Sequence, residues 1–280
     1  MRCRITGLFL IALYATTASG QGQPRSGAGN STIKRNWPDD GAQQGSALQP
    51  SWDGPDAVGL QFRDTAAVKP QFSAVPVSML RISGAALKEM QKSDKALKAG
   101  DVRQSADHLE KMLVLTPDLA VGHNMLGTRY VAIGDYEKAL NEFQKAVAIQ
   151  PNYRIAVDNM TVAMCIQHKY AAAEPYARWA LQIQPEAPTS RYLLGSILIS
   201  QGKSTDEALR LLQGVKEQYP RARLFIANTL VTRGQLQQAA EEIREYVNSP
   251  RATDNGVAQE WLGRLEKQLD AQKREAGQPQ

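Results

Sequence analysis

The sequence is poor in the residues that build disulfide frameworks, metal sites and active sites. Of its 280 residues only two are cysteine, Cys3 and Cys165, and only three are histidine. The histidines lie far apart in the chain, and Cys165 and His168 together offer one metal ion only two ligands. No Gly-x-Ser-x-Gly motif, glycine-rich phosphate loop or His-Glu-x-x-His motif is present. We therefore expect no metal, no other cofactor and no catalysis, so the chain is not expected to be an enzyme.

Long apolar runs are also missing, except near the N-terminus. Residues 1–20 combine Arg2 and Arg4 with an apolar stretch and end in three small residues, the pattern of a signal peptide. The stretch is too short to cross a bilayer core of about 30 Å comfortably, which favours a cleaved signal over an uncleaved anchor. Cys3 precedes the apolar stretch, which excludes the usual lipid anchor. The sequence thus predicts an exported chain, periplasmic or secreted, without a stable membrane span after cleavage.

Charge of one sign is not concentrated anywhere. The chain has 33 basic and 28 acidic residues and a pI of about 9.1. Both signs are interspersed along the helical segments, as on solvated faces, so no nucleic-acid partner is expected.

Residues 21–76 are rich in Gly, Pro, Ser and Gln and show no sustained helical period. Such a segment cannot bury enough apolar surface to offset its ordering entropy, so it is predicted to be a disordered linker. Trp37 and Trp52 within it are either part of a docking motif or incidental, and the composition favours the second interpretation. Residues 77–82 alternate between apolar and polar and predict a short extended lead-in to the next region.

A unit of 34 residues follows, and residues 120–153 show it most clearly. Apolar and small residues recur at the helical period in each half of the unit. They are Leu126, Gly127 and Tyr130 in the first half, and Tyr136, Ala139, Phe143 and Ala146 in the second. Gly134 suits a left-handed residue that closes the first helix, and Asp135 can cap the second. Gly127 and Ala139 are small where the two backbones should approach, so the unit is predicted to be a helical hairpin ended by Pro151.

These residues resemble the tetratricopeptide repeat family, whose 34-residue pattern is roughly W..LG..Y, then A...F..A, then P. His123 replaces the aromatic residue at the first position. The resemblance implies an all-α, right-handed superhelical solenoid of about five hairpins plus a C-terminal capping helix. The repeats are expected at about 86–119, 120–153, 154–187, 188–222 and 223–250, within a solenoid region 77–250, with the capping helix at 251–270 and a frayed tail at 271–280.

Several repeats depart from the pattern. The third has His168 where glycine is usual, a residue that tolerates left-handed geometry, and Pro175 inside its second helix. The fourth gains one residue, which a capping box at 204–207 is expected to absorb, and it ends with Leu212, Val215 and a proline. The first helix of the fifth is shortened.

The family resemblance implies a concave groove, lined by the first helix of each hairpin, that binds an extended peptide or a partner helix. The inward positions carried over are Asn124, Thr128, Val131, Asp158, Val162, Tyr192, Ser196, Ile199, Leu224 and Asn228. Asn124 and Asp158 stand where family members that bind a C-terminal carboxylate have lysine, so that ligand is not expected. Some of these residues could instead only pack between repeats.

The main hypothesis is a non-catalytic scaffold for protein–protein interaction outside the cytoplasm. One alternative is a structural subunit of a cell-envelope assembly that uses its convex face or its N-terminal lead-in. A less favoured alternative is an exported enzyme. A further variant of the main hypothesis is self-inhibition, with residues 72–79 occupying the groove.

Overall fold

The computed structural model describes residues 82–203, 206–252 and 255–276. Within these ranges the chain forms eleven helices and no strand. The predicted signal peptide at 1–20, the linker at 21–76, with its two tryptophans, and residues 77–81 of the lead-in lie outside the described residues. The fold that the described residues adopt is the predicted all-α solenoid of hairpins.

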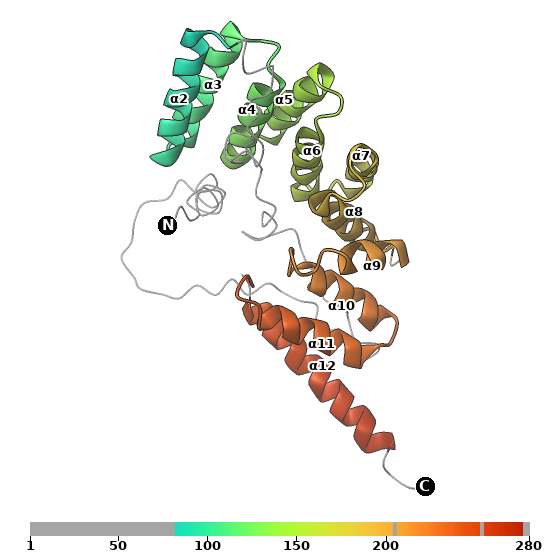
Figure 1. The fold of residues 1–280 in the computed structure, drawn as a ribbon. Helices are drawn as coiled ribbons and strands as arrows, with labels where there is room; N and C mark the ends of the chain where they lie inside the picture. The colour runs from blue at the N-terminus through green and yellow to red at the C-terminus, as the bar shows by residue number, and fades with distance from the viewer. Residues whose placement is uncertain (1–81, 204–205, 253–254, 277–280) are drawn as a thin grey trace, which may run out of the picture.

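The helices come in five antiparallel pairs followed by one long helix (Figure 1). The pairs are α2 (Gly84–Lys98) with α3 (Val102–Leu115), α4 (Ala120–Ile133) with α5 (Tyr136–Ile149), α6 (Arg154–Ile166) with α7 (Tyr170–Ile183), α8 (Pro188–Ser200) with α9 (Asp206–Gln213), and α10 (Ala222–Thr232) with α11 (Leu236–Val247). The last helix is α12 (Asn255–Ala276).

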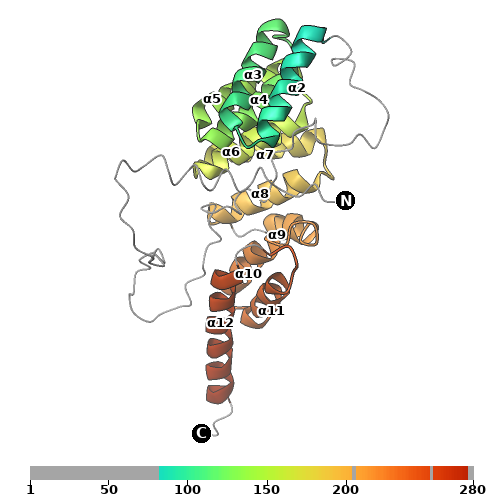
Figure 2. The same cartoon turned by 90° about the vertical axis from the view of Figure 1, so that its left-hand side faces the viewer.

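The pairs stack in chain order along an arc, with the first helix of each pair on its inner side (Figures 1 and 2). Each helix packs on the next along the chain, and the first helices also contact one another, α4 with α6, α6 with α8 and α8 with α10. Contacts of similar extent between successive second helices are not found among the described helices. Helices on the inside of an arc lie closer together, so these contacts fit the curvature. We call the inward-facing side of α4, α6, α8 and α10 the inner face.

Left-handed residues close the first helix of each hairpin. Gly134 has φ +88° and ends α4, and Asp135 then accepts a hydrogen bond from the Lys138 backbone N–H at the start of α5. The third hairpin has His168 at this place, with φ +57°. These turns agree with the predicted roles of both residues, because only glycine and a few polar residues adopt positive φ at low cost.

Three helix boundaries differ from the sequence expectation. α9 has only eight residues and ends at Gln213 before Gly214, so Val215 lies in the following turn, although its side chain is buried. The predicted capping box at 204–207 falls partly outside the described residues. α12 continues to Ala276, whereas a frayed tail was expected from residue 271. Its last turns consist of strong helix formers, with Lys273 and Arg274 near the negative end of the helix dipole.

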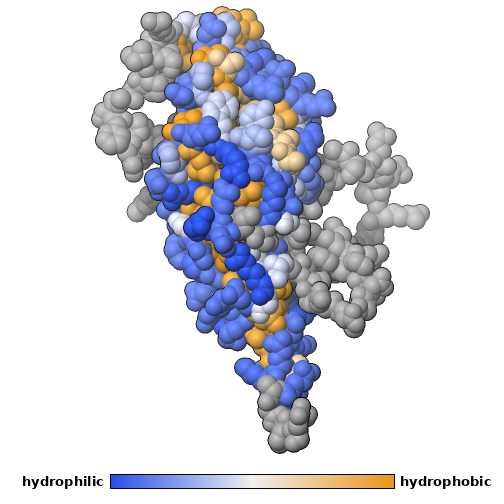
Figure 3. Space-filling model, turned by 90° about the vertical axis from the view of Figure 1, so that its right-hand side faces the viewer, coloured by the Kyte–Doolittle hydropathy of each residue, from blue (hydrophilic) through white to orange (hydrophobic). Residues whose placement is uncertain are grey.

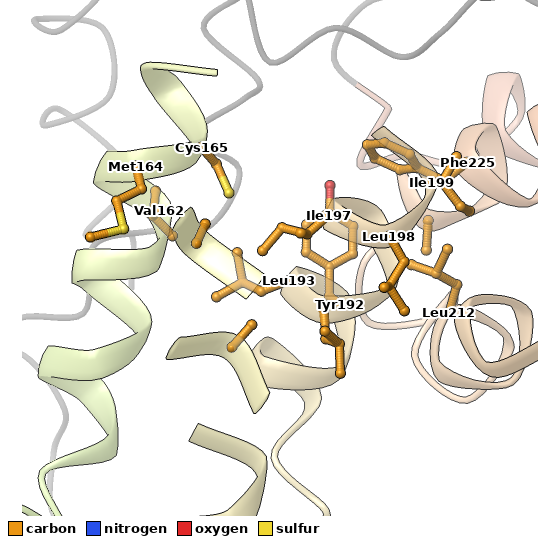
Figure 4. Close-up of a cluster of buried hydrophobic side chains, with 14 of the residues drawn as sticks. Val162, Met164, Cys165, Tyr192, Leu193, Ile197, Leu198, Ile199, Leu212 and Phe225 are labelled. Atoms are coloured by element: carbon orange, nitrogen blue, oxygen red, sulfur yellow. The ribbon is translucent and has the colours of Figure 1, made fainter. Parts of the chain in front are cut away.

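The core is a continuous layer between the two rows of helices. One buried cluster covers α2–α7, a second α4–α10 and a third α10–α12. Tyr130 and Tyr176 pack against the first two clusters, and Leu230 joins the last two. Figure 4 shows part of the second cluster, where side chains from α6, α8, α9 and α10 meet. Repeat stacking therefore buries one apolar layer from end to end, as expected for a solenoid.

The two helices of a hairpin touch at a pair of buried positions sixteen or seventeen residues apart. In α4–α5 these are Gly127 and Phe143, and a Cβ atom on Gly127 would lie 2.5 Å from a carbon of the Phe143 ring. In α8–α9 a Cβ atom on Gly195 would lie 2.6 Å from Leu212 Cγ and 3.2 Å from the backbone oxygen of Ala208. The small residues are therefore needed for the close approach of the two helices.

Candidate functional site

The ten residues predicted to line a groove all lie on the first helices of the second to fifth hairpins, but most are hidden from solvent. Nine of them are buried and only Leu224 is half-buried. Val131, Val162, Tyr192 and Ile199 belong to the large apolar cluster of the core, and the last three are visible in Figure 4. The burial of these four favours the interpretation that they pack between repeats.

The polar residues of the inner face join neighbouring first helices. Asn159 on α6 donates from Nδ2 to Asn124 Oδ1 on α4, at 2.8 Å. Ser190 on α8 donates from Oγ to Asp158 Oδ1 on α6, at 2.7 Å. Arg154 forms an ion pair with the other oxygen of Asp158. This polar ladder fixes the spacing of three successive inner helices, and it also neutralises the one carboxylate among the predicted residues.

The two hydroxyl residues of the predicted set donate within their own helices. Thr128 Oγ1 donates to the Met125 carbonyl oxygen at 2.6 Å, and Ser196 Oγ donates to the Tyr192 carbonyl oxygen at 2.7 Å. Such bonds satisfy a buried hydroxyl without any outside partner. Neither residue therefore has an unused hydroxyl donor for a ligand.

Two amide groups of the inner face do have unused capacity. Asn124 Nδ2 on α4 and Asn228 Oδ1 on α10 are buried, and neither has a hydrogen-bond partner among the described residues. A buried polar atom without a partner costs about 1–3 kcal/mol. One atom is a donor and the other an acceptor, so together they can receive the C=O and N–H groups of a peptide main chain.

An aromatic cluster lies between α8 and α10. The ring of Tyr192 stacks on that of Tyr219, with centroids 5.0 Å apart and an interplanar angle of 24°, and meets Phe225 edge-on at 6.2 Å. Burial raises the pKa of Tyr192 to about 12. The sequence prediction missed Tyr219 and Phe225, because the first lies in a turn without helical period and the second is not an inward position of the repeat. Aromatic residues near Pro220 were the available signal.

His123, which replaces the usual aromatic residue, has a structural place. Its Nδ1 lies 2.6 Å from Glu142 Oε2 on α5, and its Nε2 lies 2.8 Å from the Pro117 carbonyl oxygen before α4. Burial would raise the pKa of Glu142, but hydrogen bonds from His123 and Lys145 lower it below its usual value. The imidazole thus links α4 to the preceding loop and to its partner helix.

Cys165 on α6 is fully buried, and this burial raises the pKa of its thiol. Within the described part of the chain, no three His, Cys, Asp or Glu side chains gather in a group that could hold a metal ion. Among the same residues, no helix is long and apolar enough to cross a membrane. The chemistry of the inner face is therefore that of amides, hydroxyls and apolar side chains.

A curved stack of helical hairpins, with small residues at each hairpin contact and left-handed residues at each turn, defines a class of α-solenoid. Solenoids of this class present extended concave surfaces to other proteins. Family models described as "Tetratricopeptide repeat" match residues 120–153 and residues 167–223. The chain belongs to the tetratricopeptide repeat family.

Solved structures show the same fold. "MamA 41-end from Desulfovibrio magneticus RS-1" superposes with a TM-score of 0.55 at 18% identity, covering 62% of this chain and 99% of that one. A structure described as "Crystal structure of MamA protein" has a TM-score of 0.52 at 20% identity, covering 58% of this chain and 90% of that one. No curated protein sequence matches the chain. At these identities the likeness concerns the fold alone.

Proposed function

We propose that this chain is a non-catalytic scaffold, exported from the cytoplasm, that binds an extended peptide or a helix of a partner protein along its inner face. The observation that carries the proposal is the pair of unused amide atoms, Asn124 Nδ2 and Asn228 Oδ1, on the inner helices α4 and α10. The export rests on residues 1–20 of the sequence.

The chemistry of the inner face indicates what such a ligand contains. Asp158 is already paired with Arg154 and Ser190, which leaves the predicted lining without an unpaired carboxylate. Leu224 is the most exposed of the predicted residues and is apolar. The partner segment is therefore expected to be apolar with few charges, held by main-chain hydrogen bonds to the two amides.

An isosteric substitution tests the role of Asn124. Asn124→Asp keeps the Oδ1 acceptor for Asn159 and replaces the unused donor Nδ2 by an oxygen. Uncharged peptides of about ten residues, enough to cross several inner helices, are selected from a displayed library against the full chain. The variant should bind the selected peptides about tenfold more weakly or less, since one lost hydrogen bond and a repelled carbonyl cost at least about 1.4 kcal/mol.

The matched control is Asn152→Asp, the same chemical change at an exposed loop position. It should bind like the wild-type chain. Leu224→Ala provides a second inner-face variant without a buried charge, and thermal unfolding by circular dichroism checks that each variant is folded. Equal affinity of the wild type, Asn124→Asp and Leu224→Ala would contradict a ligand on the inner face.

The outer side supports a second candidate, a structural subunit that docks through its second helices. Figure 3 shows this side as mostly hydrophilic with separate apolar areas. Val114 and Leu115 at the end of α3 are 81% and 49% exposed. If Val114→Asp abolishes recovery of a copurified partner while Asn124→Asp does not, this candidate replaces the inner-face scaffold.

A further inference from the structure

The first helices are buried on every side, whereas the second helices are not. In α4 all ten residues from 120 to 129 are buried, and in α6 all ten from 156 to 165. Ten residues make almost three helical turns, so they point in every direction around the axis. In α5, by contrast, exposed residues follow the usual amphipathic pattern, namely Glu137, Lys138, Asn141, Gln144 and Lys145.

The described helices account for only part of this burial. α4 packs against α3, α5 and α6, and α6 packs against α4, α5, α7 and α8. Among the described elements none covers the inward side of α4 or α6 (Figures 1 and 2). Nevertheless Asn124 is 0% exposed, Thr128 4% and Val162 2%. The inner face therefore has the burial of a surface that is covered.

We propose that residues 72–81 of the same chain occupy the inner face and compete with the partner for it. The inference rests on the proposed function and adds a means of regulation, because a partner can bind only by displacing this segment. The chain then carries its own competitor at a fixed high effective concentration.

The length and position of the segment fit the inner face. It ends directly before Ile82, where the described chain enters α2, the first helix of the stack. Ten extended residues span about 33–36 Å. Neighbouring inner helices are separated by about 8–10 Å, so the three steps from α4 to α10 amount to about 24–30 Å. The segment can therefore reach both unused amide atoms.

The chemistry of the segment matches as well. Residues 72–81 read Phe-Ser-Ala-Val-Pro-Val-Ser-Met-Leu-Arg, with a single charge at the end, whereas residues 21–71 contain acidic and basic residues throughout. Val77 and Met79 alternate with Ser78, so an extended chain would turn both apolar side chains to one surface. Pro76 favours extended backbone at and before it. The other residues have both an N–H and a C=O for Asn228 Oδ1 and Asn124 Nδ2.

A competition experiment on the full chain tests the inference. The probe is a fluorescent synthetic peptide of residues 70–82, and its affinity is measured by anisotropy. Val77→Asp/Met79→Asp removes the apolar contacts of the internal segment, and Val58→Asp/Val68→Asp is the matched control in the preceding segment. The first variant should bind the probe at least about tenfold more tightly than the wild type, because the tethered competitor is lost. The control should bind like the wild type.

Further outcomes separate this inference from the proposed function. Adding Asn124→Asp to the Val77→Asp/Met79→Asp chain should weaken probe binding again, and an unchanged affinity would overturn the inference. If library peptides bind the wild type and Val77→Asp/Met79→Asp equally, and Asn124→Asp still weakens them, the inner-face scaffold stands and self-occupation is wrong. If sedimentation shows a dimer that Val77→Asp/Met79→Asp dissociates, the segment belongs to a second copy, which also overturns the arrangement within one chain.

Discussion

The hairpins α4–α5 and α6–α7 have nearly the same helix bounds but different local signals. Gly134 closes α4 and Asp135 caps α5 with its side chain, whereas His168 and Lys169 stand at these places before α7, and Lys169 forms no side-chain cap. α7 also contains Pro175 and still has 14 residues, as α5 has. Contact with the neighbouring repeats can therefore hold the helices of a hairpin in register without the full set of local signals.

The interiors of the two hairpins differ in a compensating way. Gly127 faces Phe143 in α4–α5, whereas the equivalent positions of α6–α7 hold Thr161 and Ala177. A small and a large residue are thus exchanged for a medium and a small one, and all three side chains are fully buried. Equal helix bounds result because each pair fills the contact without a clash.

Exchanging these pairs should give the largest effect. Phe143→Ala is expected to lower the free energy of unfolding by about 4 kcal/mol through the cavity it leaves. Gly127→Thr should lower it by about 2 kcal/mol, because a Cβ atom there would meet the Phe143 ring at 2.5 Å.

The double variant Gly127→Thr/Phe143→Ala reproduces the pair found in α6–α7. It should be more stable than the sum of the single changes implies by about 2 kcal/mol. Urea unfolding of the four chains gives the coupling. Simple additivity would show that the two positions do not compensate each other.

The turn residues sharpen the comparison at a smaller scale. Gly134→Ala should lower stability by about 1.5 kcal/mol, since φ +88° is costly for a residue with a Cβ atom. His168→Ala should change stability by less than about 0.5 kcal/mol, because this turn already accommodates a side chain at φ +57°. Thermal unfolding of both variants checks this, and equal losses would refute the explanation.

The caps provide a reciprocal test. Asp135→Ala removes the side-chain acceptor for the Lys138 N–H and should cost about 1 kcal/mol. Lys169→Asp supplies such an acceptor at the start of α7 and should gain about 1 kcal/mol. If Lys169→Asp does not stabilise the chain, the two turns differ in more than the identity of the cap.

The smallest expected effect is a dependence on acid pH that only α6–α7 contributes. Glu174 on α7 accepts hydrogen bonds from Lys203, Gln201 and Arg178, which lower its pKa to about 2. The position equivalent in α5 is Leu140. A carboxyl group with a lowered pKa stabilises the fold above its ordinary pKa, near 4.5, and this contribution is lost as the pH falls towards 2.

Glu174→Gln should therefore reduce the loss of stability between about pH 4.5 and 2, by less than about 1 kcal/mol because the group is near the surface. Urea unfolding at several pH values measures the slope for both chains. Identical slopes would assign the acid sensitivity to other carboxylates.

The periodic parts of the fold were predictable from the sequence. Glycine and proline recur with the repeat, and they mark the ends of helices by their backbone restrictions. Gly134, Asp135 and His168 consequently have the turn and cap geometry expected of them. The spacing of Asn124 and Asn228 also places both on first helices, as expected.

The burial of the candidate site was not predictable in the same way. Spacing assigns a residue to a helix face, whereas exposure depends on what packs against that face. Tyr192 and Ile199 were expected to line a groove, but they are buried in the core cluster. The length of α9 depended on Gly214, which interrupts no visible period, and that of α12 on good helix formers without an apolar stripe.

The two ends of the stack have unequal capacity to associate. Ala258, Trp261 and Leu265 of α12 bury the apolar edge of α11, and the outer side of α12 carries exposed charged residues such as Arg264 and Glu266. At the opposite end Leu87 on α2 is 41% exposed. Open fibres need two different complementary ends, whereas one adhesive end allows only closed two-fold pairs. A long terminal helix therefore protects a chain of repeating units from unlimited polymerisation.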